Sequence, residues 1–446
     1  MIKKILIANR GEIAVRIIKA AREMKIKTVA VYSTADKDSL HIRMADQAMC
    51  IGPASVKESY LNKFALITTA LMTGADAIHP GYGFLSENEE FAEMVEKHGL
   101  TFIGPKPKDI KLMGDKIAAK ETAKNAGLPI TPDSNGEVSS IEQAQRIANK
   151  IGYPVIIKAA YGGGGRGIRK VMEEDQLTEA FLSARKEGEL AFGNPAVYME
   201  KYLEDPKHIE VQIFGDGKGT AVAVGDRDCS VQRRHQKVVE EALSPTLTER
   251  QRDSILSSAK RAVERMKYRG AGTFEFLFEK GKFYFMEMNT RLQVEHPVTE
   301  EVFGVDLVKE QIRIASGEPL SIRQRYLKPQ GHSIECRINA EDPETFIPSP
   351  GKITKLVVPQ IDGVRFDTFI YQGFSVPTSY DSMIGKLIVH GKDRLDTIEK
   401  MKLALSKLEI EGIKTNIPLH LKILNSKGFV EGNYSQNWLE KNIDSL

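Results

Sequence analysis

Short apolar runs and amphipathic stretches alternate along the N-terminal part of the chain. Residues 4–8, 28–32 and 75–79 are apolar runs, and each predicts a buried strand. Residues 12–24, between the first two runs, carry apolar side chains at helical spacing. Strands that alternate with helices predict an α/β fold with a parallel sheet and helices on both faces.

Two glycine-rich loops follow predicted strands. Residues 79–88 follow the third strand, where open α/β sheets bind ligands, although a tight turn is an equally good interpretation. Residues 161–168 hold five glycines in six positions and follow a strand at 153–160 that contains Lys158. Backbone N–H groups of such a loop can approach an anion, and Lys158 adds a charge. We predict a phosphate-binding lid, with a flexible linker as the alternative.

Neither the first turn nor the second loop has the standard nucleotide-binding spacing. The turn at residues 8–12 lacks Gly-x-Gly-x-x-Gly, so we expect no dinucleotide cofactor there. The loop at 161–168 is not a Walker A motif, because no Gly-Lys-Ser/Thr follows at the required distance.

Residues 273–278 and 282–289 alternate apolar and polar side chains and predict a β-hairpin closed by a three-residue loop. In that register Glu275 and Glu287 share a face, about 7–8 Å apart at Cα. A two-residue loop would put them on opposite faces. Carboxylate and amide oxygens suit Mg²⁺, so we predict a metal site here, with a merely solvated sheet face as the alternative.

If the extended conformation continues past residue 289, alternate residues bring further polar groups to that face. They are Asn289, Arg291, Gln293 and Glu295.

Further elements are predicted downstream. Alternating patterns indicate strands at residues 197–203, 208–213, 332–339, 352–358, 364–370 and 384–389, and helical spacing indicates helices at 248–266, 393–408 and 416–425. In the strand at 332–339, Ile334, Cys336 and Ile338 face one way, and Glu335, Arg337 and Asn339 the other. We expect a mixed sheet in this part. The basic run at 227–237 favours anion binding over a solvated surface or an RNA-binding patch.

Composition limits the class of protein. With 446 residues, 41% hydrophobic and 28% charged, we expect a globular protein of two to four domains. No apolar run is long enough for a membrane span or a signal peptide. A net charge of +3 gives no support for nucleic-acid binding. The cysteines Cys50, Cys229 and Cys336 form no metal-binding spacing and suit a reducing cytoplasm.

Several long motifs carry a resemblance to a known family. They stand at residues 7–14, 79–88, 113–116, 161–168, 227–230, 232–237, 287–291, 293–297 and 335–342. Together they resemble biotin carboxylase, of the ATP-grasp superfamily, along the whole chain. The resemblance implies a Rossmann-like domain at 1–115, a linker helix and mobile lid at 116–203, and a C-terminal α+β part at 204–446.

The same resemblance implies the site residues. The ATP-binding set would be Lys116, Lys158, Gly163, Gly164, Gly165, Glu200, Lys201, Leu203, His208, Gln232, His235 and Leu277. The ligands of Mg²⁺ or Mn²⁺ would be Glu275, Glu287 and Asn289. The bicarbonate set would be Lys237, Arg291, Gln293, Val294 and Glu295, with Glu295 as general base. The biotin set would be Tyr82, Gly83 and Arg337.

The implied reaction has two stages. Deprotonated bicarbonate attacks the γ-phosphoryl group of ATP and forms carboxyphosphate. Carboxyphosphate yields CO₂, and the released phosphate takes a proton from biotin, whose enolate-like oxygen Arg337 would stabilise. Lys237 and Arg291 would act as catalytic cations beside Glu295.

The chain has no Ala-Met-Lys-Met sequence for attaching biotin. We therefore expect a biotin carboxyl carrier protein and a carboxyltransferase on other chains, as in acetyl-CoA carboxylase of fatty acid biosynthesis, and family habit suggests a homodimer. The acyl acceptor stays open between acetyl-CoA, propionyl-CoA and pyruvate. Leu243 and Asp226 depart from the usual proline and glutamate of the family, and neither touches an assigned role.

Two other functions compete with this one. Another ATP-grasp ligase, joining a carboxylate to an amine, would use the same ATP residues; the residues Arg291, Gln293 and Glu295 and the loop at 79–88 argue against it. An ATP-responsive binding module without turnover would be expected to lack Glu295 or the metal carboxylates, and all are present.

Overall fold

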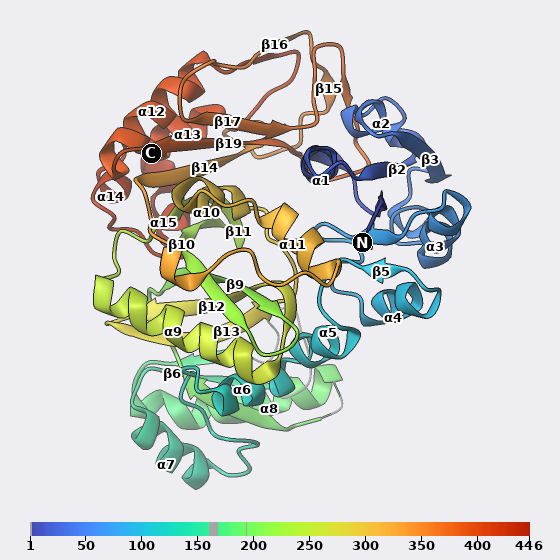
Figure 1. Cartoon of the computed structure of the whole chain (residues 1–446). Coiled ribbons are helices and arrows are strands. Elements are labelled where there is room, and N and C mark those ends of the chain that lie inside the picture. The colour runs from blue at the N-terminus through green and yellow to red at the C-terminus, as the bar shows by residue number, and fades with distance from the viewer. Residues whose placement is uncertain (1, 160–167, 193) are drawn as a thin grey trace. The chain divides into compact units, whose positions relative to one another are not determined.

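The structure, a computed structural model, describes residues 2–159, 168–192 and 194–446. The chain divides into two compact units, drawn in Figure 1. The large unit comprises Met1–Leu128, Lys207–Leu277 and Met286–Leu446, and the small unit comprises Pro129–Pro206 and Phe278–Phe285.

The N-terminal sheet of the large unit is parallel, in the order β3-β2-β1-β4-β5. Its strands are β1 (Lys4–Ile7), β2 (Lys27–Ser33), β3 (Gln47–Gly52), β4 (Ala77–His79) and β5 (Thr101–Phe102). Its helices are α1 (Gly11–Glu23), α2 (Leu40–Met44), α3 (Lys63–Met72), α4 (Glu89–Lys97), α5 (Pro107–Gly114) and α6 (Lys116–Ala126).

Alternate residues of β1 enter different cores. Ile5 and Ile7 pack with α1, and Leu6 packs with α3 and α4. Both faces of the sheet are therefore covered, as the alternation of strands and helices predicted. The blue segments of Figure 1 show this arrangement.

An eight-stranded sheet, ordered β13-β12-β9-β10-β11-β14-β19-β17, forms the centre of the large unit. Its strands are β9 (Lys207–Asp216), β10 (Ala221–Arg233), β11 (Gln236–Ala242), β12 (Arg269–Glu279), β13 (Lys282–Asn289), β14 (His332–Asn339), β17 (Val364–Thr368) and β19 (Met383–Gly391). A mixed sheet was expected, but the described pairs from β9 to β17 are antiparallel.

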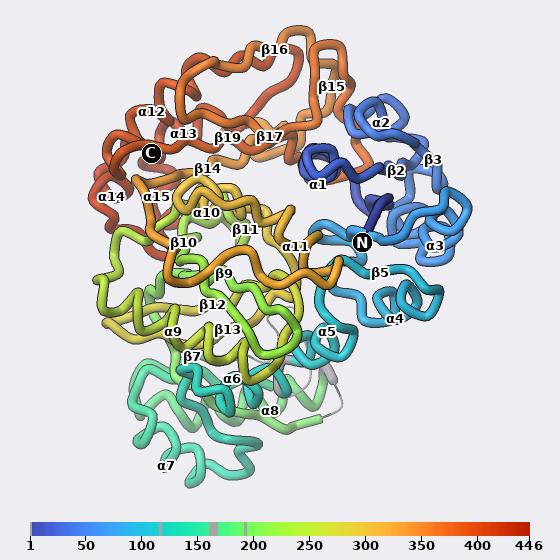
Figure 2. Tube along the Cα trace, viewed as in Figure 1, coloured from blue at the N-terminus to red at the C-terminus, as the bar shows by residue number. Residues whose placement is uncertain are grey.

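Helices and small sheets complete this part. The helices are α9 (Glu249–Met266), α10 (His296–Phe303), α11 (Leu307–Ala315), α12 (Arg394–Lys407), α13 (Ile417–Asn425), α14 (Lys427–Val430) and α15 (Trp438–Asn442). Two small sheets pair β15 (Gly351–Lys352) with β18 (Ser375–Val376), and β16 (Lys355–Val357) with β20 (Glu409–Glu411). Helix α12 packs on β14 and β19, and α13 packs on α12, as Figure 2 traces.

The small unit is built on a three-stranded antiparallel sheet, β7-β6-β8. Its strands are β6 (Val155–Ala159), β7 (Ile168–Val171) and β8 (Val197–Lys201), and its helices are α7 (Ile141–Ile151) and α8 (Leu177–Phe192). Ile157, Phe181 and Val197 lie in a core shared by these elements. The glycine loop at 161–168, with Gly163, Gly164 and Gly165, falls almost entirely outside the described residues.

The hairpin of β12 and β13 differs from its prediction. Lys280 and Gly281 alone form the turn, both with positive φ, because type I′ turns match the twist of a hairpin. The three-residue loop was therefore wrong. In a regular hairpin this two-residue turn would place Glu275 and Glu287 on opposite faces. Met286 and Glu287 are both exposed on the edge strand β13.

The extended conformation also ends sooner than the alternation suggested. Strand β13 stops at Asn289, and α10 begins at His296 with a proline in its first turn. The intervening segment is irregular, so Arg291, Gln293 and Glu295 are oriented by their tertiary contacts rather than by strand alternation.

Candidate active site

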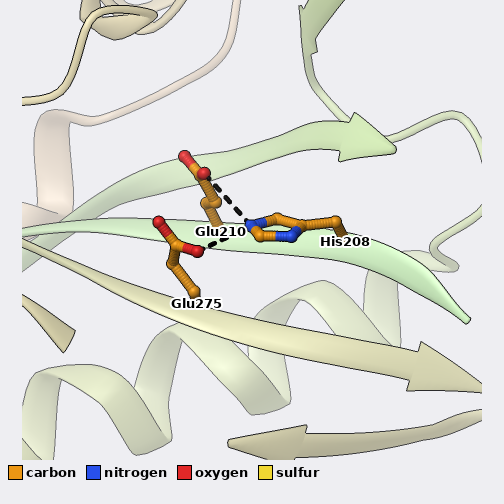
Figure 3. A group of neighbouring side chains, drawn as sticks. All are labelled: His208, Glu210 and Glu275. Carbon is orange, nitrogen blue, oxygen red and sulfur yellow. Dashed lines mark ion pairs between the residues drawn. The ribbon is translucent and has the colours of Figure 1, made fainter. Parts of the chain in front are cut away.

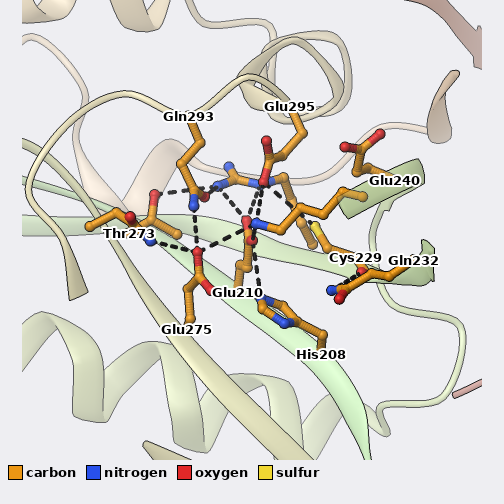
Figure 4. A network of polar contacts seen from close by, with 12 residues as sticks. His208, Glu210, Cys229, Gln232, Glu240, Thr273, Glu275, Gln293 and Glu295 are labelled. Carbon is orange, nitrogen blue, oxygen red and sulfur yellow. Dashed lines mark hydrogen bonds and ion pairs between the residues drawn. The ribbon is translucent and has the colours of Figure 1, made fainter. Parts of the chain in front are cut away.

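Three carboxylates surround the ammonium group of Lys237 on β11. Its Nζ forms ion pairs with Glu210, with Glu295 at 2.7 Å and with Glu275 at 3.4 Å. Figure 4 shows these glutamates converging from β9, from β12 and from the turn before α10. Burial alone would lower the pKa of the lysine, but the carboxylates outweigh it and hold that pKa well above its usual value. Lys237 is therefore cationic at neutral pH.

A β-bulge on β11 brings a further acid to the same side. The pairing of β10 with β11 shifts by one residue between Gln232 and Val231, so that Val238 is an extra residue on β11, and it shifts back between Val231 and Asp228. One extra residue reverses the alternation of side chains. Glu240 therefore faces the same side as Lys237, and Glu241 faces the opposite core.

Arg227, on β10, is completely buried and fixes two members of the cluster. Its Nε and Nη2 donate to Glu210 Oε2 at 3.0 and 2.9 Å, and Nη2 donates to Gln293 Oε1 at 2.8 Å. The amide of Gln293 then donates through Nε2 to Glu275 Oε1 at 2.6 Å. The orientation of the Gln293 amide follows from these two contacts.

His208, Glu210 and Glu275 form a compact group that could be taken for a metal site (Figure 3). His208 Nε2 lies 2.9 Å from Glu275 Oε2 and 3.4 Å from Glu210 Oε1. Burial disfavours a charged imidazole, but the two carboxylates outweigh it and raise the pKa of His208 to about 9. The raised pKa favours a protonated imidazole, and the three side chains are arranged as an ion-pair cluster.

Arg337, on β14, connects this cluster to Glu240. Its Nε donates to Glu240 Oε1 at 2.5 Å, and its Nη2 donates to Glu295 Oε2 at 3.0 Å. Burial opposes ionisation of Glu295, but Lys237 and Arg337 outweigh it, so the pKa of Glu295 is lowered. Glu295 is thus an ionised carboxylate between two cations, and it can accept a proton from a bound ligand.

Arg291 joins the cluster through Asn289. The Asn289 amide donates to Glu275 Oε1 at 2.5 Å and accepts from Arg291 Nη2 at 3.1 Å. Nε of Arg291 donates to Glu87 Oε2, in the loop at 79–88, at 2.8 Å. Arg291 is held at the rim of the cluster and does not contact Glu295.

A buried lysine on β19 supports the segment before α10. Lys386 donates from Nζ to the carbonyl oxygen of Val294 at 2.7 Å and pairs with Glu12 Oε1 at 3.1 Å. Glu12 also accepts a hydrogen bond from the hydroxyl of Tyr82. One acid–lysine pair therefore connects Val294, in the predicted bicarbonate set, with Tyr82, in the predicted biotin set.

The loop that holds Tyr82 and Gly83 is fixed at the point where the strand order of the parallel sheet reverses. Asn9, after β1, donates from Nδ2 to the carbonyl oxygens of Pro80 and Tyr82, each at 2.7 Å. Gly81 has φ of +64°, and a Cβ there would lie 2.9 Å from that nitrogen, so this turn requires glycine. Gly83 is exposed with open space above it.

The proposed metal ligands suit Mg²⁺ in their chemistry. Glu275 is ionised, because Lys237 and His208 outweigh burial and hold its pKa well below the usual value. Asn289 lies against it, and Glu287 stands two residues earlier on β13. Two carboxylates and an amide oxygen are hard ligands of the kind that Mg²⁺ binds. That these three side chains share one ion stays a prediction.

The predicted ATP residues lie in both units, and each group is described within its own. In the small unit, Lys158 pairs with Glu200 across β6 and β8, and Lys201 donates from Nζ to the carbonyls of Gly152 and Tyr153 at 2.9 and 2.8 Å. Leu203 is buried beyond β8. Their role toward ATP stays a prediction.

In the large unit, Gln232 is buried and donates to the carbonyl of Cys229 at 2.8 Å. His235 is exposed in the turn between β10 and β11, Leu277 is half-buried on β12, and Lys116 begins α6. His208, expected at the adenosine, lies among the carboxylates of the central cluster. Its contact with ATP also stays a prediction.

Several members of the site were missed from the sequence. They are Asn9, Glu12, Glu87, Glu210, Arg227, Glu240 and Lys386. Glu210 could have been found, because His208, Glu210 and Gln212 alternate along one strand. Lys386 could not, because it is a lone lysine in an apolar strand far from its partners in sequence.

Family profiles cover most of the chain. The profile described as "Biotin carboxylase, N-terminal domain" matches residues 1–110, and "Biotin carboxylase C-terminal domain" matches residues 335–441. Between them, "Carbamoyl-phosphate synthase L chain, ATP binding domain" matches residues 115–323. A curated biotin carboxylase of Haemophilus influenzae is 57% identical over 444 residues, covering 99% of each chain.

The chain belongs to the biotin carboxylase family. Solved structures of biotin carboxylases share its ATP-grasp fold. The biotin carboxylase of Campylobacter jejuni, in a crystal structure described as a β-γ-ATP complex, superposes with a TM-score of 0.89 at 51% identity, covering 99% of each chain. The biotin carboxylase domain dimer of Hydrogenobacter thermophilus 2-oxoglutarate carboxylase, in complex with MgADP, ADP and bicarbonate, gives a TM-score of 0.87 at 48% identity. That match covers 99% of this chain and 98% of the other.

Proposed function

We propose that this protein carboxylates biotin on a separate carrier protein, using ATP and bicarbonate, as the first half-reaction of a biotin-dependent carboxylase. The observation that carries this proposal is the arrangement of Glu295, an ionised carboxylate held between Lys237 and Arg337. Family membership supports ATP, bicarbonate and biotin as the reactants.

In the first stage, bicarbonate would lie against Lys237 and Arg291, with the amide of Gln293 and the backbone of Val294 beside it. Glu295 takes the proton of bicarbonate, and a bicarbonate oxygen forms a bond to the γ-phosphorus of ATP as ADP leaves. Lys237 offsets the added negative charge. Because Lys237 already has three carboxylate partners, bicarbonate must displace one of these contacts in order to bind.

Phosphoryl transfer also needs the metal and the ATP residues. Glu275, Glu287 and Asn289 would hold Mg²⁺ or Mn²⁺, which supplies charge compensation for the phosphates. Lys116, Lys158 and the loop at 161–168 would hold the phosphates of ATP, and Glu200, Lys201, Leu203, His208, Gln232, His235 and Leu277 would surround the nucleoside.

In the second stage, the C–O bond of carboxyphosphate breaks and gives CO₂ and phosphate. The phosphate removes the proton from the ureido nitrogen of biotin, and this nitrogen forms the new bond to CO₂. Arg337 stabilises the negative charge on the ureido oxygen, and Tyr82 and Gly83 lie along the biotin.

A homodimer and two partner chains complete the proposal. The related 2-oxoglutarate carboxylase domain is described as a dimer. We infer a dimer for this chain, testable by light scattering, and we expect a biotin carboxyl carrier protein and a carboxyltransferase as partners. Acetyl-CoA carboxylase is one complex that would contain them. None of the helices in the described residues is long and apolar enough to cross a membrane. The free thiols of Cys50, Cys229 and Cys336 suit a cytoplasmic location.

The direct test is ADP release with Mg²⁺, with bicarbonate and biotin each present or absent. We expect slow release that requires bicarbonate and rises with biotin. The variant Glu295→Ala should lower it by about 10²–10⁴-fold, the usual contribution of a general base. Turnover that ignores bicarbonate and biotin but responds to an amine would instead support a carboxylate–amine ligase of the same fold.

A further inference from the structure

The guanidinium of Arg337 is held along one edge only. Nε and Nη2 contact Glu240 and Glu295, as described above. Within the described residues, Nη1 has no hydrogen bond or ion pair. A planar guanidinium that is fixed by its Nε and Nη2 groups has a set orientation, with Nη1 available to another acceptor.

Behind Arg337 lies a second acid that the proposed reaction does not use. Glu335 pairs directly with Glu240 across β14 and β11, so the two side chains share a face. Both carboxyl oxygens of Glu335, and Oε2 of Glu240, are buried without a hydrogen-bond partner among the described residues. Such groups are uncommon in native structures and call for an explanation.

The groups around this acid pair decide how many protons it holds. Arg337 on β14, Lys237 on β11 and Lys386 on β19 are the nearby cations, and Glu295 is an additional anion. Burial, together with the neighbouring acids, raises the pKa of Glu335 well above its usual value despite Lys386. Burial also raises the pKa of Glu240, to about 7, although Arg337 opposes the rise.

These values fit the geometry. Glu240 accepts a hydrogen bond from the Arg337 guanidinium. Glu335 has no hydrogen-bond partner among the described residues and is the neutral member of the pair. Two adjacent buried carboxylates do not both ionise readily, because the two negative charges would repel each other and neither would be solvated.

We propose that Glu240 is the positioning residue of Arg337, holding its guanidinium so that Nη1 faces the ureido oxygen of biotin. This inference rests on the proposed function. It assigns Glu240 to the biotin stage, where Arg337 contacts the substrate, while Lys237 still lies beside Glu295 for bicarbonate activation.

The test compares two rates in each variant: ADP release with bicarbonate alone, and carboxylation of free biotin. We expect Glu240→Gln to lower biotin carboxylation about 10- to 100-fold, as misplacement of a catalytic group does. Bicarbonate-dependent ADP release without biotin should fall less than biotin carboxylation, so the ratio of the two rates should drop. Glu240→Asp keeps the charge at a shorter reach and should restore part of the biotin rate.

The pH profile separates positioning from a structural role. In the wild type, biotin carboxylation should fall as the pH drops through about 7, because protonated Glu240 holds Arg337 less well. This fall in rate below about pH 7 is called the acidic limb of the profile. ADP release without biotin, which uses the same bicarbonate, should lack the acidic limb. The limb should disappear in Glu240→Gln, and persist in Glu240→Asp and in Glu335→Gln, where one neutral group replaces another.

Glu241→Gln is the matched control. Glu241 is the next residue on the same strand, is equally buried and pairs with an arginine, Arg394, at 2.7 Å, but it faces the opposite core. Its substitution should leave the ratio of the two rates unchanged.

The inference is overturned if Glu240→Gln lowers both rates in proportion, lowers neither, or keeps the limb near pH 7. If Glu240→Gln does not fold, Glu240→Asp decides. The inference is then overturned if the ratio of biotin carboxylation to ADP release without biotin is the same in Glu240→Asp as in the wild type. If biotin has no effect on turnover by the wild type, the proposed function itself is wrong. A normal wild-type response with proportional losses in the variants would remove only this inference.

Discussion

At the scale of single residues, the charge of Lys237 holds three carboxylates in one buried cluster. Without it, only Arg227, His208 and Arg337 would remain as cations for four acids, Glu210, Glu240, Glu275 and Glu295. An uncompensated buried charge is far more costly than a broken surface pair. Lys237 is therefore expected to stabilise the fold as well as bind an anion.

We expect Lys237→Met to lower the free energy of unfolding by about 3–5 kcal/mol, the usual cost of removing one partner of a buried pair. Urea denaturation at pH 7 measures it. Lys111→Met is the control, because Lys111 pairs with Glu89 while its side chain is 72% exposed; its loss should leave stability nearly unchanged. Equal effects of the two substitutions would contradict this account of the cluster.

Sequence patterns predicted some residues of the site and not others. Alternation at 332–339 correctly separated Arg337 from the core-facing Cys336, and the structure places Arg337 against Glu240 and Glu295. Those partners stand 97 and 42 positions away, separations that no local pattern encodes. The family resemblance supplied Glu295, but neither the resemblance nor the local pattern supplied Glu240.

At the scale of elements, most strands and helices could be predicted, because each has a clear apolar period. Strand β14 agrees with its prediction at both ends, and α9 begins where Thr248 caps it. The bulge at Val238 could not be predicted, because it arises from the pairing of two strands rather than from the sequence of one. It nevertheless decides which acid faces Arg337.

The turn of the β12–β13 hairpin gives a prediction at this scale. Lys280 has φ of +50°, a conformation that Asn adopts more readily than lysine. Lys280→Asn should raise the free energy of unfolding by about 0.5 kcal/mol, as optimised turns do. Thermal unfolding measures the change. A melting temperature below that of the wild type would show that the positive φ at position 280 does not destabilise the protein.

Glu241 links β11 to β14 and α12 and makes stability depend on pH. Its Oε2 lies 2.6 Å from His332 Nε2 and 2.7 Å from Arg394 Nε. Burial alone would raise the pKa of Glu241, but these partners outweigh burial and lower that pKa to about 2. Because this folded pKa lies below the unfolded value of about 4.3, the stabilisation is present above pH 4.3 and is lost as the pH falls toward 2.

Glu241→Gln should remove this part of the pH dependence. We expect the difference in unfolding free energy between wild type and variant to be on the order of 3 kcal/mol at pH 6 and to shrink toward pH 2, measured by urea titration. A difference that stays constant across this range would mean that the carboxylate charge is not what stabilises the contact.

At the scale of the whole molecule, the site combines segments from distant parts of the chain. The loop at 79–88, β9 to β11, the segment before α10, and β14 with β19 each contribute charged groups to one cluster. The parallel sheet and its helices followed from the sequence pattern. The meeting of these segments did not, because it depends on the order of strands in the eight-stranded sheet.

The most direct test of the central claim follows oxygen atoms. ATP is turned over in the presence of biotin with bicarbonate labelled with ¹⁸O, and the released phosphate is analysed by mass spectrometry. If bicarbonate attacks the γ-phosphorus, one labelled oxygen passes into each phosphate as the C–O bond of carboxyphosphate breaks. Phosphate that carries oxygen only from ATP and water would contradict the claim that this site activates bicarbonate.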